Sequence, residues 1–315
     1  MLQSGVTHFP LADTDAEVWP CCDLLVSSSF RVHHDCRSQA DSRQQKGRHA
    51  VNAEVIRLGD ISASWLANQL DNDGVVQLRD VISNEWLEAL RGWVTDHIAD
   101  HGDGDFLIAQ ADEIGSPAHQ LVSDPALQQL FSETAKLRLP KAVAGQHIQC
   151  GIPVRAGTSP KFRPRLFHYD TSVLTMLVPI FIPRAAIGSC GELAAFGNKR
   201  PFRRSVASHF VDMILTYNSV YRRRVAKAVL DSPEKHIVDF QPGDACVFWG
   251  YRTYHGNLTC ARGLLRATLV LQYGQVHSDS WALRVAWTFS RSRRALRRFQ
   301  YQPDTTVESV LAGTR

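Results

Sequence analysis

The sequence lacks the features that mark membrane-spanning and secreted proteins. No run of about 18 apolar residues occurs, so no transmembrane helix is expected. Residues 1–20 have neither a basic start nor a long apolar stretch, which argues against a secretory signal. The formal net charge is only +4, so charge alone does not mark the chain as a binder of nucleic acid. We expect a soluble cytoplasmic protein with no nucleic-acid partner.

The seven cysteines include no C-x-x-C pair, and their number is odd. Neither a disulfide framework nor a zinc ribbon is therefore indicated, and reduced thiols are expected. The chain has 315 residues, of which 44% are hydrophobic and 21% charged. These values are ordinary for a globular protein, and the length allows one large domain with a sizeable core.

The two ends of the chain differ in amino-acid composition from the part between them. Residues 1–50 contain a polar stretch of mixed charge without periodicity, which predicts a disordered leader. Residues 51–290 are expected to form one domain, and residues 291–315 to form a basic C-terminal tail. No internal repeat is found.

The domain is predicted to begin with a helix, a short strand and a second helix. Residues 61–74 combine apolar residues at helical spacing with a final Gly74, which favours a helix that stops there. Residues 75–82 indicate a short strand, and Ser83 is placed to cap a helix over residues 84–98.

From about residue 147 the pattern changes to short runs of strand composition separated by turn signals. One helix is expected in this half, over residues 219–230. Short strand-like runs separated by turns in this way are typical of an antiparallel sandwich or barrel. The predicted strands cover residues 147–154, 163–170, 173–183, 191–197, 236–240, 244–250 and 264–274.

One of these strands carries two ionisable residues on the same face. His168 and Asp170 are two apart, and residues i and i+2 of a strand point to the same side, with Phe167 and Tyr169 opposite. An imidazole and a carboxylate supply two of the three ligands of the 2-His-1-carboxylate site. That site leaves three positions open on Fe(II) for substrate and O₂.

His255 is the candidate for the third ligand, since it follows a turn and an apolar strand. Eleven residues later comes Arg266, which shares a strand face with Thr268 and Gln272 while the opposite face is apolar. Arg266 is therefore expected to be buried, and a buried arginine needs an anion. A dicarboxylate cosubstrate would provide one.

This set of residues resembles the Fe(II)/2-oxoglutarate dioxygenases, in particular the phytanoyl-CoA dioxygenase-like family. Residues 70–91 also resemble that family's opening helix–strand–helix, and the likeness runs from about residue 54 to residue 275. The resemblance implies a mainly β fold with flanking helices, the double-stranded β-helix or jelly roll. It implies that His168, Asp170 and His255 bind iron and that Arg266 binds the distal carboxylate of 2-oxoglutarate. The implied activity is hydroxylation of a C–H bond of a small organic substrate by O₂, with succinate and CO₂ as co-products.

The H-x-D spacing by itself is not specific, because it occurs at two other places in this chain. His33 and Asp35 lie in the polar leader and have no later histidine followed by an arginine at about ten residues. His277 and Asp279 have no histidine after them. Only the pair at 168 and 170 has the complete set in a strand context.

Three further residues are candidates for contact with the cosubstrate. Thr268 shares the face of Arg266 and could donate a hydrogen bond to the same carboxylate. The alternative is a plain β-branched strand residue. Thr175 and Gln149 lie on predicted strands near the three ligands.

Two basic clusters, residues 198–204 and 221–224, are expected around the mouth of the barrel. A solvated surface is the ordinary interpretation, and an anionic group on the small-molecule substrate is the sharper hypothesis. The basic C-terminal segment is expected to be an exposed helix end.

Two alternative functions remain open. A JmjC-type demethylase or hydroxylase shares the H-x-D…H pattern but typically anchors its cosubstrate with a lysine on another strand, so Arg266 argues against it. A non-catalytic jelly-roll module that binds a ligand or partner would form no succinate. Asp170 argues against a halogenase, since related halogenases lack this carboxylate.

Overall fold

The computed structural model describes residues 55–101, 105–109, 111–143, 146–155, 167–203 and 205–277. The predictions for the leader over residues 1–50 and for the tail over residues 291–315 lie outside these ranges. Among the helices in the described ranges, none is both long enough and apolar enough to cross a membrane.

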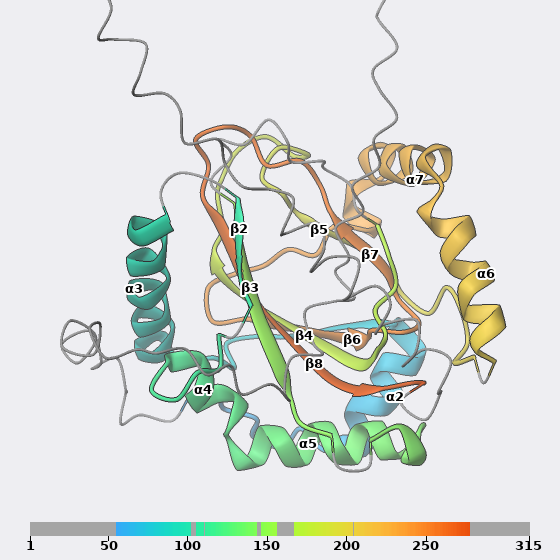
Figure 1. Ribbon diagram of the computed structural model, residues 1–315, viewed down its shortest axis with the longest axis horizontal. Coiled ribbons are helices and arrows are strands. Elements are labelled where there is room, and N and C mark those ends of the chain that lie inside the picture. The colour runs from blue at the N-terminus through green and yellow to red at the C-terminus, as the bar shows by residue number, and fades with distance from the viewer. Residues whose placement is uncertain are drawn as a thin grey trace, which may run out of the picture.

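The described strands form two antiparallel sheets, and every pairing between neighbours is antiparallel (Figure 1). The smaller sheet pairs β5 (Leu193–Phe196) with β7 (Tyr254–Asn257). The larger sheet has, in spatial order, β1 (Val75–Leu78), β6 (Ala245–Trp249), β4 (Ser172–Phe181), β8 (Arg266–Gln275), β3 (Gln149–Arg155) and β2 (Phe106–Ile108).

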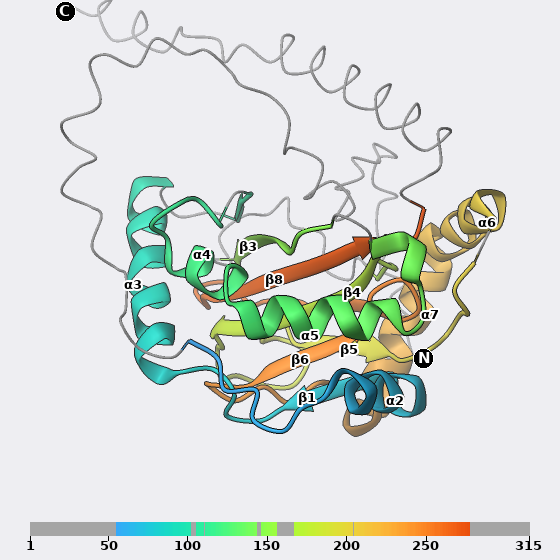
Figure 2. The same cartoon turned by 90° about the horizontal axis from the view of Figure 1, so that it is seen from below.

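Helices from the first half of the chain pack on the outer face of the larger sheet, as Figure 2 shows for α2 and α5. Ala267, Leu269 and Leu271 point from β8 into this core. They form the apolar face that the alternation along residues 264–274 predicts. The helices of this layer are α2 (Ala63–Asp73), α3 (Asn84–His101), α4 (Pro117–Val122) and α5 (Pro125–Lys136), followed by the short 3₁₀ helix η2 (Pro140–Val143).

The predicted opening of the domain is confirmed. Helix α2 ends at Gly74, whose φ of 78° is left-handed and whose N–H donates to the carbonyl of Leu70. A Cβ at Gly74 would lie 2.4 Å from the Cα of Gly197, so this position also needs a residue without a side chain. The N–H of Trp86 donates weakly to the Oγ of Ser83 (3.5 Å), as expected for a cap of α3.

The outer face of the smaller sheet is covered by α7 (Ser219–Asp231), where Phe167, Ala194 and Tyr254 pack against Ala226 and Val229. The expectation of one helix in this half is wrong, because α6 (Val206–Tyr217) precedes α7. Asn218 separates the two helices, and its side chain accepts hydrogen bonds from the first N–H groups of α7. The short 3₁₀ helix η3 (Pro233–Lys235) follows.

Two predicted strands are reduced to single bridges. In the described part of residues 163–170, His168 makes one isolated antiparallel bridge with His255. Residues 236–240 contribute one bridge, between Ile237 and Ala194, on the edge of β5 that does not pair with β7. The other predicted strands are found. The described part of the chain is thus an antiparallel β structure with flanking helices, and the assignment to the double-stranded β-helix stays a prediction.

The space between the two sheets is lined by side chains from both. Leu177, Cys246 and Phe248 of the larger sheet pack with Leu193 of the smaller one, and Val270 of β8 lies against them. This cluster is called the inter-sheet cluster below, and the candidate site lies beside it.

Candidate metal centre

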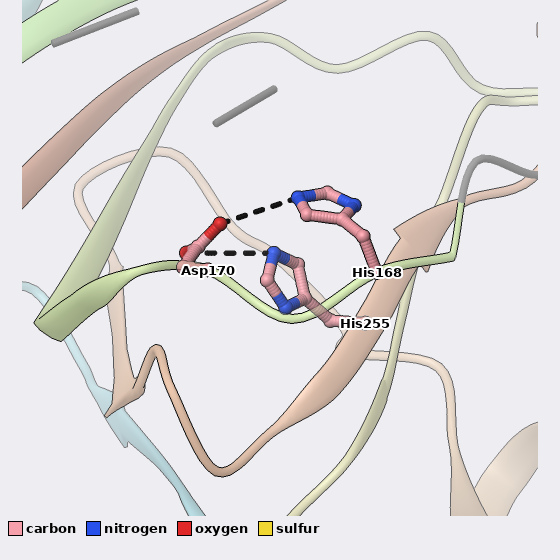
Figure 3. A group of neighbouring side chains, drawn as sticks. All are labelled: His168, Asp170 and His255. Atoms are coloured by element: carbon pink, nitrogen blue, oxygen red, sulfur yellow. Dashed lines mark ion pairs between the residues drawn. The ribbon is translucent and has the colours of Figure 1, made fainter. Parts of the chain in front are cut away.

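Two imidazoles meet because His168 and His255 are direct cross-strand partners. Each of these residues donates its backbone N–H to the carbonyl of the other, at 2.8 and 3.0 Å. Residues paired in this way carry their side chains on the same face. The two ring centroids are accordingly 4.5 Å apart (Figure 3).

Asp170 completes the group with one carboxylate oxygen toward each ring, as Figure 3 shows. Its Oδ1 lies 3.2 Å from Nε2 of His168, and its Oδ2 lies 3.7 Å from Nε2 of His255. The N–H of Asp170 donates to the carbonyl of Gly250, which fixes the backbone at this point. All three side chains are buried.

The three residues fit a first-row divalent metal. One donor atom from each lies within 4.8 Å of the others, and no fourth histidine, cysteine, aspartate or glutamate of the described residues joins this group. Cis ligands at about 2.1 Å from an ion lie roughly 3 Å apart, close to the shorter of the two measured separations. Two imidazoles and one carboxylate are the donor set of the facial triad of non-haem Fe(II) oxygenases.

The ionisation states also suit a metal. Burial alone would raise the pKa of Asp170, but attraction to His255 and the hydrogen bond with His168 outweigh it and lower the pKa to about 2. Burial lowers the pKa of His255 to about 4, although Asp170 opposes this shift. Near neutral pH the site therefore offers a carboxylate and a neutral imidazole, the forms that bind metal.

Neighbouring polar groups orient these ligands. The carbonyl of Thr253 lies 3.1 Å from Nδ1 of His255 and can only accept, so Nδ1 carries the proton and Nε2 keeps its lone pair. The hydroxyl of Thr175 donates to Oδ2 of Asp170 at 2.5 Å, and the hydroxyl of Ser172 lies 2.9 Å from that of Thr175. The structure thus places Thr175 on the carboxylate ligand, whereas the sequence suggested contact with the cosubstrate.

Gly250 lies against Ser172, Thr175 and Asp170 and was not singled out from the sequence. A Cβ here would lie 2.5 Å from the hydroxyl oxygens of both Ser172 and Thr175 and 3.1 Å from the Cβ of Asp170. Three side chains converge on one backbone position, so only glycine fits. Neither Gly250 nor Ser172 belongs to a spacing pattern that could have revealed it.

Arg266 begins β8 and points into the same inter-sheet space. It is only 6% exposed, and burial together with the nearby charge of Arg155 lowers its pKa to about 10, although Cys260 and Glu192 oppose this shift. Within the described residues no hydrogen bond or ion pair to its guanidinium is found. Arg155 is its direct partner on β3 and was missed from the sequence, because the register between the two strands cannot be read from spacing.

The side chain of Arg266 lies against Gly191, where the backbone has a φ of 69°. A Cβ at Gly191 would be 2.8 Å from the Cδ of Arg266 and 3.3 Å from the Cβ of Cys260. The glycine therefore leaves the room that the arginine side chain occupies.

One face of β8 connects Arg266 with the triad. Thr268, Val270 and Gln272 follow Arg266 at intervals of two and share its face. Val270 packs on the inter-sheet cluster, while Gln272 is the cross-strand partner of both Thr175 and Gln149. Thr268 is buried opposite Pro179. The sequence-predicted residues thus lie along one inner surface, with the triad toward one end and Arg266 at the other.

Comparisons with known proteins give low similarity. No protein-family model and no curated protein matches the chain. Among solved structures, EctD from S. alaskensis with bound Fe is 17% identical, with 71% of this chain and 80% of that chain covered and a TM-score of 0.44. A Pseudomonas putida prolyl-4-hydroxylase is 13% identical, with coverage of 68% and 98% and a TM-score of 0.42. The non-heme alpha ketoglutarate dependent carbocyclase SnoK from nogalamycin biosynthesis is 17% identical, with coverage of 69% and 87% and a TM-score of 0.42. These values are too low to identify the activity of this chain.

Proposed function

We propose that the protein is an Fe(II)- and 2-oxoglutarate-dependent oxygenase with a double-stranded β-helix core. It would hydroxylate a C–H bond of a small organic substrate and release succinate and CO₂. The proposal is supported by the combination of two features in one place. A buried His168–Asp170–His255 cluster and the buried Arg266 share one inter-sheet space, and the arginine has no ion pair among the described residues.

The arginine matters because the three ligands alone do not define the reaction. Hydrolytic zinc sites also use three protein ligands and leave a position open. A guanidinium with almost no exposure is costly unless an anion pairs with it. The distal carboxylate of 2-oxoglutarate is a planar two-oxygen acceptor, which arginine matches with two parallel hydrogen bonds.

Each residue then has a defined task. His168, Asp170 and His255 would hold the ion, and the Thr175 hydroxyl would keep the carboxylate of Asp170 oriented. Arg266 would fix the distal end of 2-oxoglutarate, and the apolar inter-sheet cluster would keep water away from the cosubstrate. The bound Fe(II) would supply the activation of O₂, which no side chain of this chain can perform.

The two alternative functions make different demands. A JmjC-type enzyme would anchor the cosubstrate through a lysine, whereas here the buried cation beside the inter-sheet cluster is Arg266. A non-catalytic module would not need the ionised carboxylate and neutral imidazole that the buried site maintains. Both observations favour the arginine-anchored oxygenase.

Succinate release is the direct test. The purified chain would be supplied with Fe(II), O₂ and 2-oxoglutarate and screened against a library of small organic acids, amines and alcohols, with mass spectrometry for the gain of one oxygen atom. The proposal expects succinate formation that requires both Fe(II) and O₂ and rises with one class of compound. Arg262→Lys, at an exposed position four residues before Arg266, should behave as wild type. Absence of succinate under all conditions from a folded, iron-loaded chain would favour the non-catalytic module.

A further inference from the structure

A cavity lies on the side of the smaller sheet that faces away from the inter-sheet space. It is about 570 Å³ in volume and is bordered by α6, α7 and the segment around Arg200. Figure 1 shows these two helices beside β7, on the side of the molecule away from α3. Tyr169 is its link to the metal centre, because this residue lies between His168 and Asp170 in the chain and its ring packs on Tyr254.

The charges that line this cavity are unbalanced. Asp212 is the one carboxylate among the described lining residues, and its Oδ2 is shared by Nη1 of Arg200 at 3.4 Å and Nε of Arg203 at 3.2 Å. Arg224 also borders the cavity, and within the described residues no ion pair to it is found. The cationic side chains of the lining are Lys199, Arg200, Arg203 and Arg224. Among the described lining residues the cations outnumber the carboxylate by four to one, so the cavity favours an anion.

Arg200 lines the cavity with a guanidinium that is held in one orientation. It is 4% exposed, and its guanidinium lies 4.0 Å from the ring centre of Tyr169 and 3.8 Å from that of Tyr251. Its Nε donates to the carbonyl of Tyr251 at 2.6 Å. Stacking between two rings holds the cation in one orientation, which reduces the conformational entropy lost when a ligand binds.

The rest of the lining is apolar and exposed. Ile214 and Leu215 of α6 are 72% and 62% exposed, and Val220 and Tyr221 of α7 are also exposed. Large apolar side chains grouped around one cavity are uncommon on a protein surface unless something binds there. The volume lies within the range of small-molecule sites.

We infer that this cavity binds an organic anion, whose charged group is held by Arg200, Arg203 and Arg224 and whose apolar body lies on Ile214, Leu215 and Tyr221. The inference goes beyond the proposed oxygenase function, because this cavity faces α6 and α7 and not the inter-sheet space. It does not depend on iron or on 2-oxoglutarate.

Two fluorescent probes that differ only in charge test how the cavity binds the charged group and the apolar body of such a ligand. 8-Anilinonaphthalene-1-sulfonate carries a sulfonate on an apolar double-ring body, and N-phenyl-1-naphthylamine is the same body without the charge. Titrations into the metal-free full chain should show the anionic probe binding at least about tenfold more tightly, with an affinity that falls as salt is added. Benzenesulfonate, which has the charge and a smaller body, should displace the probe only weakly. Equal affinity for the charged and uncharged probes would overturn the inference.

Exposed arginines outside the cavity lining supply the control variants. The double variant Arg203→Gln/Arg224→Gln should weaken binding of the anionic probe about tenfold or more, with little effect on the uncharged probe. Arg223→Gln/Arg262→Gln removes the same number of charges at exposed positions that do not line the cavity, and it should leave both affinities unchanged. If the two double variants had the same effect, the probe would be responding to overall charge and the inference would fail.

Two variants of apolar residues on α6 test the contact with the apolar body of the ligand. Leu215→Gln should weaken both probes, whereas Val211→Gln, also on α6 and 55% exposed but outside the lining, should weaken neither. The substituted side chains are largely exposed, so the variants are expected to fold, and circular dichroism would verify this. Because no measurement uses the metal, a negative result would overturn this site and leave the proposed oxygenase untouched.

Discussion

Arg155 and Arg266 face each other as direct cross-strand partners on β3 and β8. Like charges in such positions destabilise a sheet unless anions compensate for them. Asp105 lies 3.8 Å from Arg155, whereas Arg266 has no such ion pair among the described residues. A dicarboxylate bound at Arg266 would supply the missing charge, and several measurable consequences follow from this pairing.

Arg266→Lys should raise the apparent KM for 2-oxoglutarate by roughly one to two orders of magnitude, because lysine offers a point charge without the fork of two parallel hydrogen bonds. Iron affinity should change little, since the arginine is not a ligand. Steady-state succinate assays would measure the change, with Arg262→Lys as the control at an exposed position. An unchanged KM would mean that another group anchors the cosubstrate.

Arg266→Met should leave the free energy of unfolding of the ligand-free protein within about 1 kcal/mol of wild type, or raise it. The substitution replaces a buried cation that lacks an ion pair with an apolar chain and removes a like-charge neighbour of Arg155. Urea unfolding followed by tryptophan fluorescence would measure it. Arg79→Met is the comparison, because Arg79 pairs with the buried Asp244 and its loss should destabilise the protein. A larger loss for Arg266→Met would indicate a structural role.

Thr175→Val should reduce iron affinity about tenfold, because it removes the hydroxyl that donates to Oδ2 of Asp170. Thr175→Ser keeps that hydroxyl and should restore affinity. Competition with a metal-sensitive dye under anaerobic conditions would give both constants. If Val and Ser behaved alike, the hydroxyl would have no part in orienting the ligand.

His168→Ala and His255→Ala should each abolish tight iron binding while the fold survives, because two ligands hold the ion poorly and the apolar core does not involve these imidazoles. Metal content after dialysis and the far-UV spectrum would report the two properties separately. His97→Ala, on α3 and outside the cluster, should retain iron. Iron retained by either ligand variant would exclude the present assignment.

His168 and Asp170 could be picked from the sequence because their spacing is local, whereas His255 was chosen as the histidine that follows a later turn and apolar strand. Spacing of two places His168 and Asp170 on one side. The partnership of His168 with His255 needs no extended strand, and the structure has only a single bridge there. The burial of Arg266 followed from alternation along its own strand.

The remaining features depend on pairing between distant segments. Arg155, Ser172 and Gly250 matter because of what lies opposite or above them, which no spacing within one segment shows. Helix α6 was missed although Ser208, Asp212 and Thr216 follow one another at helical spacing, a signal that could have revealed it. The cavity it forms with α7 was therefore not foreseen, although its basic residues were noticed.

The central claim is that the triad and Arg266 form one site for one dicarboxylate. Calorimetric titration of 2-oxoglutarate into oxygen-free, Mn(II)-loaded protein tests this claim most directly, with 2-oxobutyrate as a monocarboxylate of the same keto acid class. We expect 2-oxoglutarate to bind at least about tenfold more tightly, to require the metal, and to lose its advantage over 2-oxobutyrate in Arg266→Ala. Equal binding of the two acids to the wild-type protein, or binding that ignores the metal, would show that the triad and the arginine do not act on the same ligand.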